Sequence, residues 1–192
     1  MGMSEGGIIN KVKVFYSFCG NEDSNRVRGI LDSLTMHSTQ KPAGIIAKKE
    51  FENLKTEGGE AIHKWIKNEL DGTSVTVVFL GTDTLENNFV RYQICESLRH
   101  GNAIIGVYIN GIEDAQTNKV SGKCDLHTVI AHYKYGTPIY FDYINDGIYD
   151  YIADDGEKNL DVWVENAAKK REDSEFDVKL KSIKMTPDNA AS

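Results

Sequence analysis

Residues 74–110 read SVTVVFLGTDTLENNFVRYQICESLRHGNAIIGVYIN, and this stretch decides the fold. It opens with a continuous apolar run, Val75–Leu80, rich in β-branched residues, which is typical of a strand covered on both faces. An amphipathic helical segment follows and ends at Gly101. A second apolar run, 103–109, predicts another covered strand. The succession of strand, helix and strand is typical of a parallel sheet.

The same alternation extends along the rest of the chain. Residues 11–18 alternate in hydrophobicity like a strand, and residues 23–36 carry apolar side chains at helical spacing. The further elements that we expect are a short strand over 44–47, a helix over 62–70, a strand over 138–144 and a helix over 157–171. These elements predict an α/β fold with an open, central parallel sheet of about five strands and helices on both faces.

Composition limits the classes of function. The chain has 192 residues and a net charge of −7, which predicts one globular domain and makes nucleic-acid binding unfavourable. Its apolar runs are too short to span a bilayer, and the three cysteines suit a reducing cytoplasm better than a disulfide framework. We therefore expect a cytoplasmic protein with no membrane partner, no nucleic-acid partner and no metal site.

Ligands of open α/β sheets bind outside the carboxyl ends of the strands, which places four loops of interest at 17–23, 48–55, 81–93 and 110–114. The first of them, SFCGNED, lies at an expected helix N-terminus, where free N–H groups favour a phosphate. One glycine is a weak signal, however, and an ordinary turn capped by Asn21 or Asp23 explains the loop as well. Cys19 is better explained as a buried or ligand-lining thiol than as a nucleophile, because no histidine is near it in sequence.

Three segments together carry a family resemblance: KVFYSFCGNEDSNRVRGIL at 13–31, the region 68–110, and YDYIADDGEKNLDVWVENAA at 149–168. They resemble the TIR-like proteins of the bacterial Thoeris anti-phage system. The resemblance implies a flavodoxin-like TIR fold and NAD as the substrate, with no separate cofactor. It further implies cleavage of the nicotinamide–ribose bond to make an ADP-ribose-derived signal nucleotide. That signal would activate a partner effector protein, and a phage protein trigger and TIR self-assembly are further partners to expect.

Position 93 departs from the family pattern. The family helix reads W-V-R-Y-E-I, and its glutamate is the catalytic residue, whereas this chain has Phe89 at the first position and Gln93 at the fifth. Cleavage builds positive charge on the ribose, which a carboxylate stabilises and a neutral amide does not. Three explanations are open: an engineered Glu→Gln change that traps a nucleotide, a natural pseudoenzyme, or transfer of the role to Glu96 one helical turn away.

The resemblance carries over less specifically to the rest of the pocket. Phe18 and Cys19 occupy the loop that lines the nucleotide in TIR domains, with Asn21 and Asp23 as polar contacts. Phe51 falls near a family tryptophan in the loop before the second helix and is a candidate for stacking on a base. Asn88 flanks the catalytic position. For each of these residues, plain packing or solvation is an equal alternative.

The expected organisation is a flexible N-terminal tail at 1–10, a TIR-like domain at 11–171 and a charged, partly disordered tail at 172–192. A competing hypothesis makes the chain a non-catalytic TIR module that assembles with other TIR domains or senses a phage protein. A third, a nucleoside 2-deoxyribosyltransferase-like enzyme, shares the broad fold, but the YDYIADDG ending argues against it.

Overall fold

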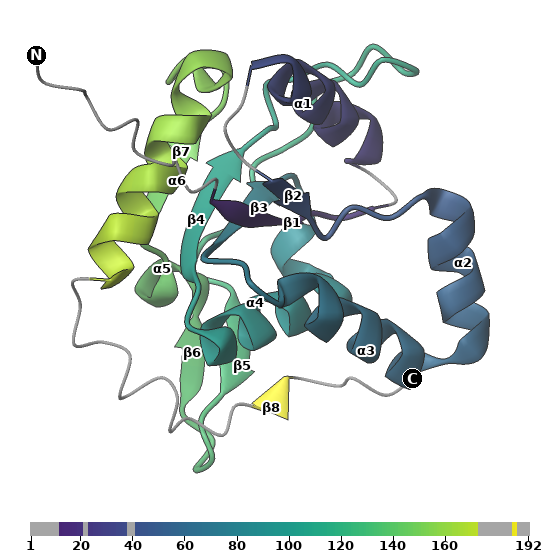
Figure 1. The fold of residues 1–192 in the computed structure, drawn as a ribbon, viewed down its shortest axis with the longest axis vertical. Helices are drawn as coiled ribbons and strands as arrows, with labels where there is room; N and C mark the ends of the chain where they lie inside the picture. Colours follow the sequence, from purple (N-terminus) through teal and green to yellow (C-terminus); the bar gives the residue numbers. More distant parts are fainter. Residues whose placement is uncertain (1–11, 21–22, 38–40, 173–185, 188–192) are drawn as a thin grey trace, which may run out of the picture.

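The computed structural model describes residues 12–20, 23–37, 41–172 and 186–187. Its central sheet has the order β2-β1-β3-β4-β7, and every neighbouring pair is parallel (Figure 1). This is the flavodoxin-like order, so the expected α/β architecture with a five-stranded parallel sheet is confirmed. The strands are β1 (Lys13–Ser17), β2 (Lys41–Ala43), β3 (Val75–Leu80), β4 (Ala103–Tyr108) and β7 (Gly147–Asp150).

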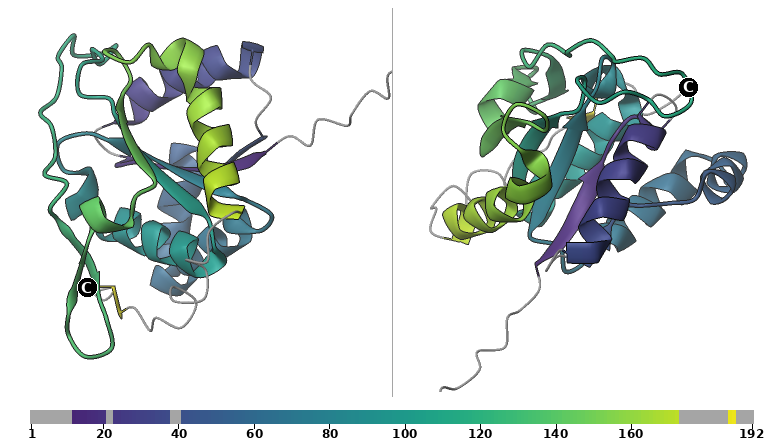
Figure 2. Two further views of the ribbon diagram at one scale, coloured as in Figure 1. Left: turned by 90° about the vertical axis from the view of Figure 1, so that its left-hand side faces the viewer. Right: turned by 90° about the horizontal axis from the view of Figure 1, so that it is seen from above.

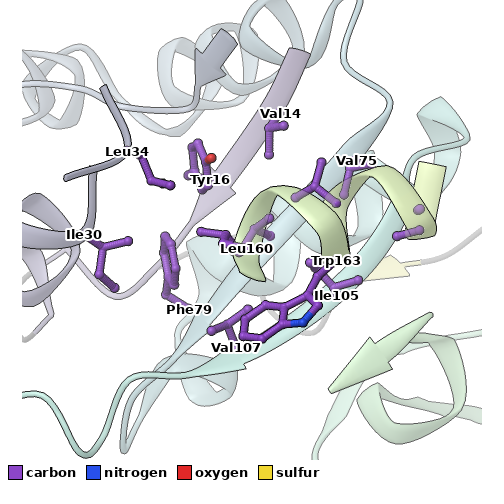
Figure 3. Packing of buried hydrophobic residues seen from close by; sticks show 14 of the residues in the cluster. Val14, Tyr16, Ile30, Leu34, Val75, Phe79, Ile105, Val107, Leu160 and Trp163 are labelled. Carbon is purple, nitrogen blue, oxygen red and sulfur yellow. The ribbon is translucent and has the colours of Figure 1, made fainter. Parts of the chain in front are cut away.

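Helices cover both faces of this sheet, as predicted (Figure 2). On one face, α1 (Ser24–His37) and α6 (Gly156–Glu172) bury a core against Val14, Tyr16 and alternate residues of β3 and β4 (Figure 3). On the other face, α3 (Gly59–Leu70) packs on Phe15, and α4 (Asn88–His100) packs on the next strands. The period-2 alternation of β1 therefore assigns each of its side chains to one of the two faces.

The expected strand over 138–144 is wrong in its location. Residues 138–140 form β6 (Pro138–Tyr140), and α5 (Phe141–Ile144) follows at once. The buried pair Phe141 and Ile144 has a spacing of three, which puts both side chains on one face of a helical turn but on opposite faces of a strand. β6 pairs with β5 (Val129–His132) in a second, antiparallel sheet whose third strand is β8 (Thr186–Pro187). The fifth strand of the central sheet is instead β7.

The region between β1 and β3 also differs from the prediction. The second strand is β2, three residues before the expected 44–47, and α2 (Lys48–Glu57) occupies the segment that we expected to be a loop. None of the residues of α2 is buried, so its sequence has no strong apolar stripe to reveal it. Gly44 ends the strand with a φ of +78°, and a Cβ there would lie 2.7 Å from the Tyr16 carbonyl oxygen.

The expected tails lie largely outside the described residues. The N-terminal tail at 1–10 falls there entirely, and in the expected tail at 172–192 only Glu172 and the two residues of β8 are described. Within the described chain, every helix is too short or too polar to cross a membrane.

Candidate functional site

The residue at position 93 meets the end of strand β1. Ser17 is the last residue of β1, and its Oγ donates a hydrogen bond of 2.6 Å to Gln93 Oε1 in the second turn of α4. Ser17 is fully buried, whereas Gln93 is half-buried. Because α4 follows β3, this contact lies between the carboxyl ends of β1 and β3. In the flavodoxin-like order that is the switch point where ligands bind.

Helix α4 is fixed at both ends. Asn87 caps its N-terminus, with a side-chain oxygen that accepts from the backbone N–H groups of Phe89 and Val90. Gly101 closes the C-terminus in the left-handed conformation, with a φ of +90°. Between these caps, one face of the helix is buried among β3, β4 and the second sheet. Asn88, the first residue of the helix, is exposed, and a ligand contact by it stays a prediction.

The loop after β1 reaches the N-terminus of α4. Cys19 is buried, and its Sγ accepts a long hydrogen bond of 3.6 Å from Asn87 Nδ2. Phe18 is half-buried and packs at the edge of the core between the sheet and α1 and α6. The structure thus brings Cys19 near the cap of the helix that carries Gln93. Asn21, the next predicted contact, lies outside the described residues.

The carboxylate of Asp23 is turned inward. Asp23 is 1% exposed, forms an ion pair of 3.2 Å with Arg26, and accepts a 3.4 Å hydrogen bond from Thr84 Oγ1. Arg26 in turn donates to the backbone oxygens of Ile112 and Lys119. This cluster joins α1 to the β3–α4 loop and to the loop after β4. A nucleotide contact by Asp23 stays a prediction, and in the structure its carboxylate bonds Arg26 and Thr84.

Two aromatic rings meet beside α4. Phe51 and Phe89 pack edge to face, with ring centroids 5.8 Å apart and an interplanar angle of 82°. The Lys55 ammonium lies 4.9 Å from the centroid of the Phe51 ring. Phe51 was expected in a loop, but it lies in α2, within a cluster that also contains Trp65. Base stacking by Phe51 therefore stays a prediction for a ring that already has two neighbours.

Glu96 has a different environment from Gln93. Its carboxylate forms an ion pair with Arg99, and its charge acts on His63 and Tyr92. Burial, followed by the charge of Glu96, raises the pKa of Tyr92 to about 12, and the Tyr92 ring stacks on His63 of α3 at 3.8 Å. Glu96 thus faces α3, whereas Gln93 faces β1.

An open hollow of about 410 Å³ lies between α3 and α4 on the side where His63 and Tyr92 stack, and neither Gln93 nor any other residue of the predicted pocket lines it. The lining residues are Glu60, His63, Lys64, Lys67, Asn68 and Tyr92.

Ser17 was predicted to lie in a ligand-binding loop, but no partner was predicted for it. A signal was present, because Ser17 follows Phe15 on the same face of a strand whose other inward positions are apolar. A hydroxyl at such a position needs a hydrogen-bond partner. Arg26 and Thr84 were also missed, and their roles depend on loops that come together only in the folded chain.

Two comparisons with known proteins bear on the chain. A family model described as Thoeris protein ThsB, TIR-like domain, matches residues 15–114. A relative from Bacillus cereus (strain MSX-D12), named "Putative cyclic ADP-D-ribose synthase ThsB1", is 33% identical over 107 residues. That alignment covers 55% of this chain and 56% of the relative, so the chain spans about half the length of the curated relative that it matches.

Proposed function

Because this chain belongs to the Thoeris ThsB TIR-like family, we propose that it is an NAD-processing protein of bacterial anti-phage defence. In the proposed reaction the bond between ribose C1′ and the nicotinamide nitrogen breaks, and nicotinamide leaves with the electron pair. An internal adenine nitrogen or a water molecule then attacks C1′, giving a cyclic or linear ADP-ribose product. We propose that this product is the signal that activates a partner effector protein, and that a phage protein triggers its synthesis.

The observation that carries the proposal is the placement of residue 93. Its side chain lies at the switch point between β1 and β3 and is oriented by the Ser17 hydroxyl at 2.6 Å. The ribose of NAD would lie beside this side chain, with Phe18, Cys19 and Asn88 around the nucleotide. Phe51 and Asn21 are proposed as further contacts, and Asp23 supports the site through Arg26 and Thr84.

Gln93 would make this copy a slow enzyme. An amide has nearly the shape of a carboxylate but carries no charge to stabilise the positive ribose. The loss of such a group typically lowers the rate by about 10²–10⁴-fold. Glu96 is a poor replacement, because it is paired with Arg99 and faces α3.

The test is to measure free nicotinamide after incubation of NAD with the protein and with its Gln93→Glu variant. Each is assayed alone and with an extract of phage-infected cells. We expect Gln93→Glu to release nicotinamide about 10²–10⁴ times faster than the protein itself. Gln93→Met is the matched control, since it keeps the size of the side chain and adds no charge. The absence of release by Gln93→Glu under both conditions would exclude the enzymatic function.

Two further outcomes assign the catalytic group. If the unchanged protein already turns over rapidly, Gln93 is not decisive, and Glu96→Gln is then the variant to measure. If Gln93→Glu is active and Glu96→Gln in that background stays active, the role belongs to position 93.

A second candidate function is favoured by the neutral amide itself. A TIR module without catalysis, acting by assembly with other TIR domains or by sensing a phage protein, needs no carboxylate at position 93. It predicts that the Gln93→Glu change leaves phage defence in cells unaltered, whereas the enzymatic proposal predicts a change in defence together with nicotinamide release.

A further inference from the structure

Residue 93 is held by two hydroxyl groups, Ser17 at the end of β1 and Ser97 one turn further along α4. We infer that one of them, Ser17, is a positioning residue that fixes which end of the residue 93 side chain faces a ligand. The inference rests on the proposed function only for the identity of that ligand.

The hydrogen bond to the side chain of residue 93 comes from β1. The Ser17 hydroxyl donates to Gln93 Oε1 at 2.6 Å, and in the described part of the chain it is the only side-chain group that hydrogen-bonds the Gln93 amide. Ser17 is fully buried, so bulk water cannot replace Gln93 as the hydrogen-bond partner of its hydroxyl. An amide oxygen and its NH2 group point in different directions. Once Ser17 binds the oxygen, the two N–H donors are directed away from β1.

The hydrogen bond to the backbone comes from α4 itself, and it is linked to β3 through Thr76. The Ser97 hydroxyl donates to the Gln93 backbone oxygen at 2.7 Å, and it accepts from Thr76 Oγ1 at 2.7 Å. Ser97 and Thr76 are both fully buried. The backbone of residue 93 is thus tied to β3 while its side chain is tied to β1. Rotation of the side chain away from the switch point would break the bond to Ser17.

The orientation has a consequence for ligand chemistry. With its oxygen bound by Ser17, Gln93 offers donors, which suit an acceptor such as a carboxamide, ether or phosphate oxygen. A carboxylate at the same place would have one oxygen bound by Ser17 and the other free to accept from a ribose hydroxyl. The same serine therefore orients an amide as a donor and a carboxylate as an acceptor, and it specifies what the site recognises in each case.

The first experiment measures this orientation without any catalysis. In the otherwise unchanged protein, Ser17→Ala should shift the side-chain NH2 resonances of Gln93 in a ¹⁵N NMR spectrum. In the Gln93→Glu protein, Ser17→Ala should raise the pKa of the introduced carboxyl by about one unit, because a hydrogen bond to the ionised form is lost. Ser17→Thr keeps a hydroxyl and should restore both values. Thr128→Ala is the matched control, since it removes another nearly buried hydroxyl, which bonds the Asp125 backbone oxygen.

The second experiment measures catalysis in the Gln93→Glu background. Ser17→Ala should lower kcat for nicotinamide release by roughly 10–100-fold with little change in KM, because the carboxylate is misplaced. Ser17→Thr should recover most of it, and Thr128→Ala should leave kcat unchanged. Unmoved NMR resonances and an unmoved carboxyl pKa in Ser17→Ala would overturn the inference, as would equal loss in Ser17→Ala and Thr128→Ala. If the NMR shifts occur and no variant releases nicotinamide, the positioning role stands and the proposed function fails.

Discussion

Substitution of Gly81 by alanine tests how much the buried ion pair between Asp23 and Arg26 contributes to stability. A Cβ added at Gly81 would lie 2.2 Å from one Asp23 carboxylate oxygen and 2.6 Å from the other. Asp23 is enclosed, being 1% exposed, and is held by Arg26 at 3.2 Å. Gly81→Ala therefore forces the carboxylate to move by about 1 Å to reach an ordinary contact distance. Such a movement breaks the ion pair and the hydrogen bond from Thr84.

The expected cost follows from the burial of both partners. Loss of one half of a buried pair typically destabilises a protein by about 3–5 kcal/mol. For a chain of this size, that corresponds to a fall in Tm of roughly 10 °C. The measurement is urea unfolding followed by the fluorescence of Trp163, which lies in α6 and is buried against the central sheet. Gly29→Ala is the control: Gly29 lies in α1 with open space around it, and alanine should stabilise the helix by about 0.5–1 kcal/mol.

A double-mutant cycle isolates the clash. In an Asp23→Ala background the carboxylate is gone, so Gly81→Ala should cost less than about 1 kcal/mol. Additive effects of Gly81→Ala and Asp23→Ala would refute the account, because the two changes would then act on separate parts of the structure. A Gly81→Ala protein as stable as the unchanged one would refute it as well.

Two pH dependences follow from other buried contacts. Hydrogen bonds from Asn25 and from the backbone of Thr117 and Gln116 lower the pKa of Asp114 to about 2. Its stabilisation should be present above the unfolded pKa near 4 and be lost as the pH falls through about 2. Unfolding measured between pH 5 and pH 2 should therefore depend less on pH in Asp114→Asn. Burial raises the pKa of Tyr92 to about 12, so its contribution should be complete below pH 10 and be lost as the pH rises through about 12. Tyr92→Phe should flatten the fall in unfolding free energy above pH 10.

The parts of the fold predicted correctly are those whose own sequence contains the burial pattern. β3 and β4 are covered on both faces, so their apolar runs mark them almost to the residue. Among the elements that were missed, α2 buries none of its residues and leaves no such pattern. The strand misplaced at 138–144 shows the opposite difficulty. Ile139 is buried in a small antiparallel sheet, whereas Phe141 and Ile144 are buried in α5, and burial alone does not say which element holds a residue.

The candidate site was likewise predicted only in part. Position 93 could be predicted because the residues around it resemble a family, yet its partner could not, since Ser17 is 76 residues away in sequence. The sequence did contain one indication of this contact, a polar residue on a strand face that is otherwise buried and apolar. On β1, Phe15 and Ser17 share the face that α3 and α4 cover, and only Ser17 is polar. A polar residue at a position that packing would fill with an apolar one is retained at a cost unless it is hydrogen-bonded. The helices packed on the same face include α4, which has several half-buried polar residues, and the structure shows that Gln93 is the one bonded to Ser17. The sheet order brings α4 to the end of β1, because β1 and β3 are neighbours and α4 follows β3. A buried hydroxyl at the last residue of a parallel strand therefore predicts a polar partner nearby, which in this chain lies on the helix after the neighbouring strand.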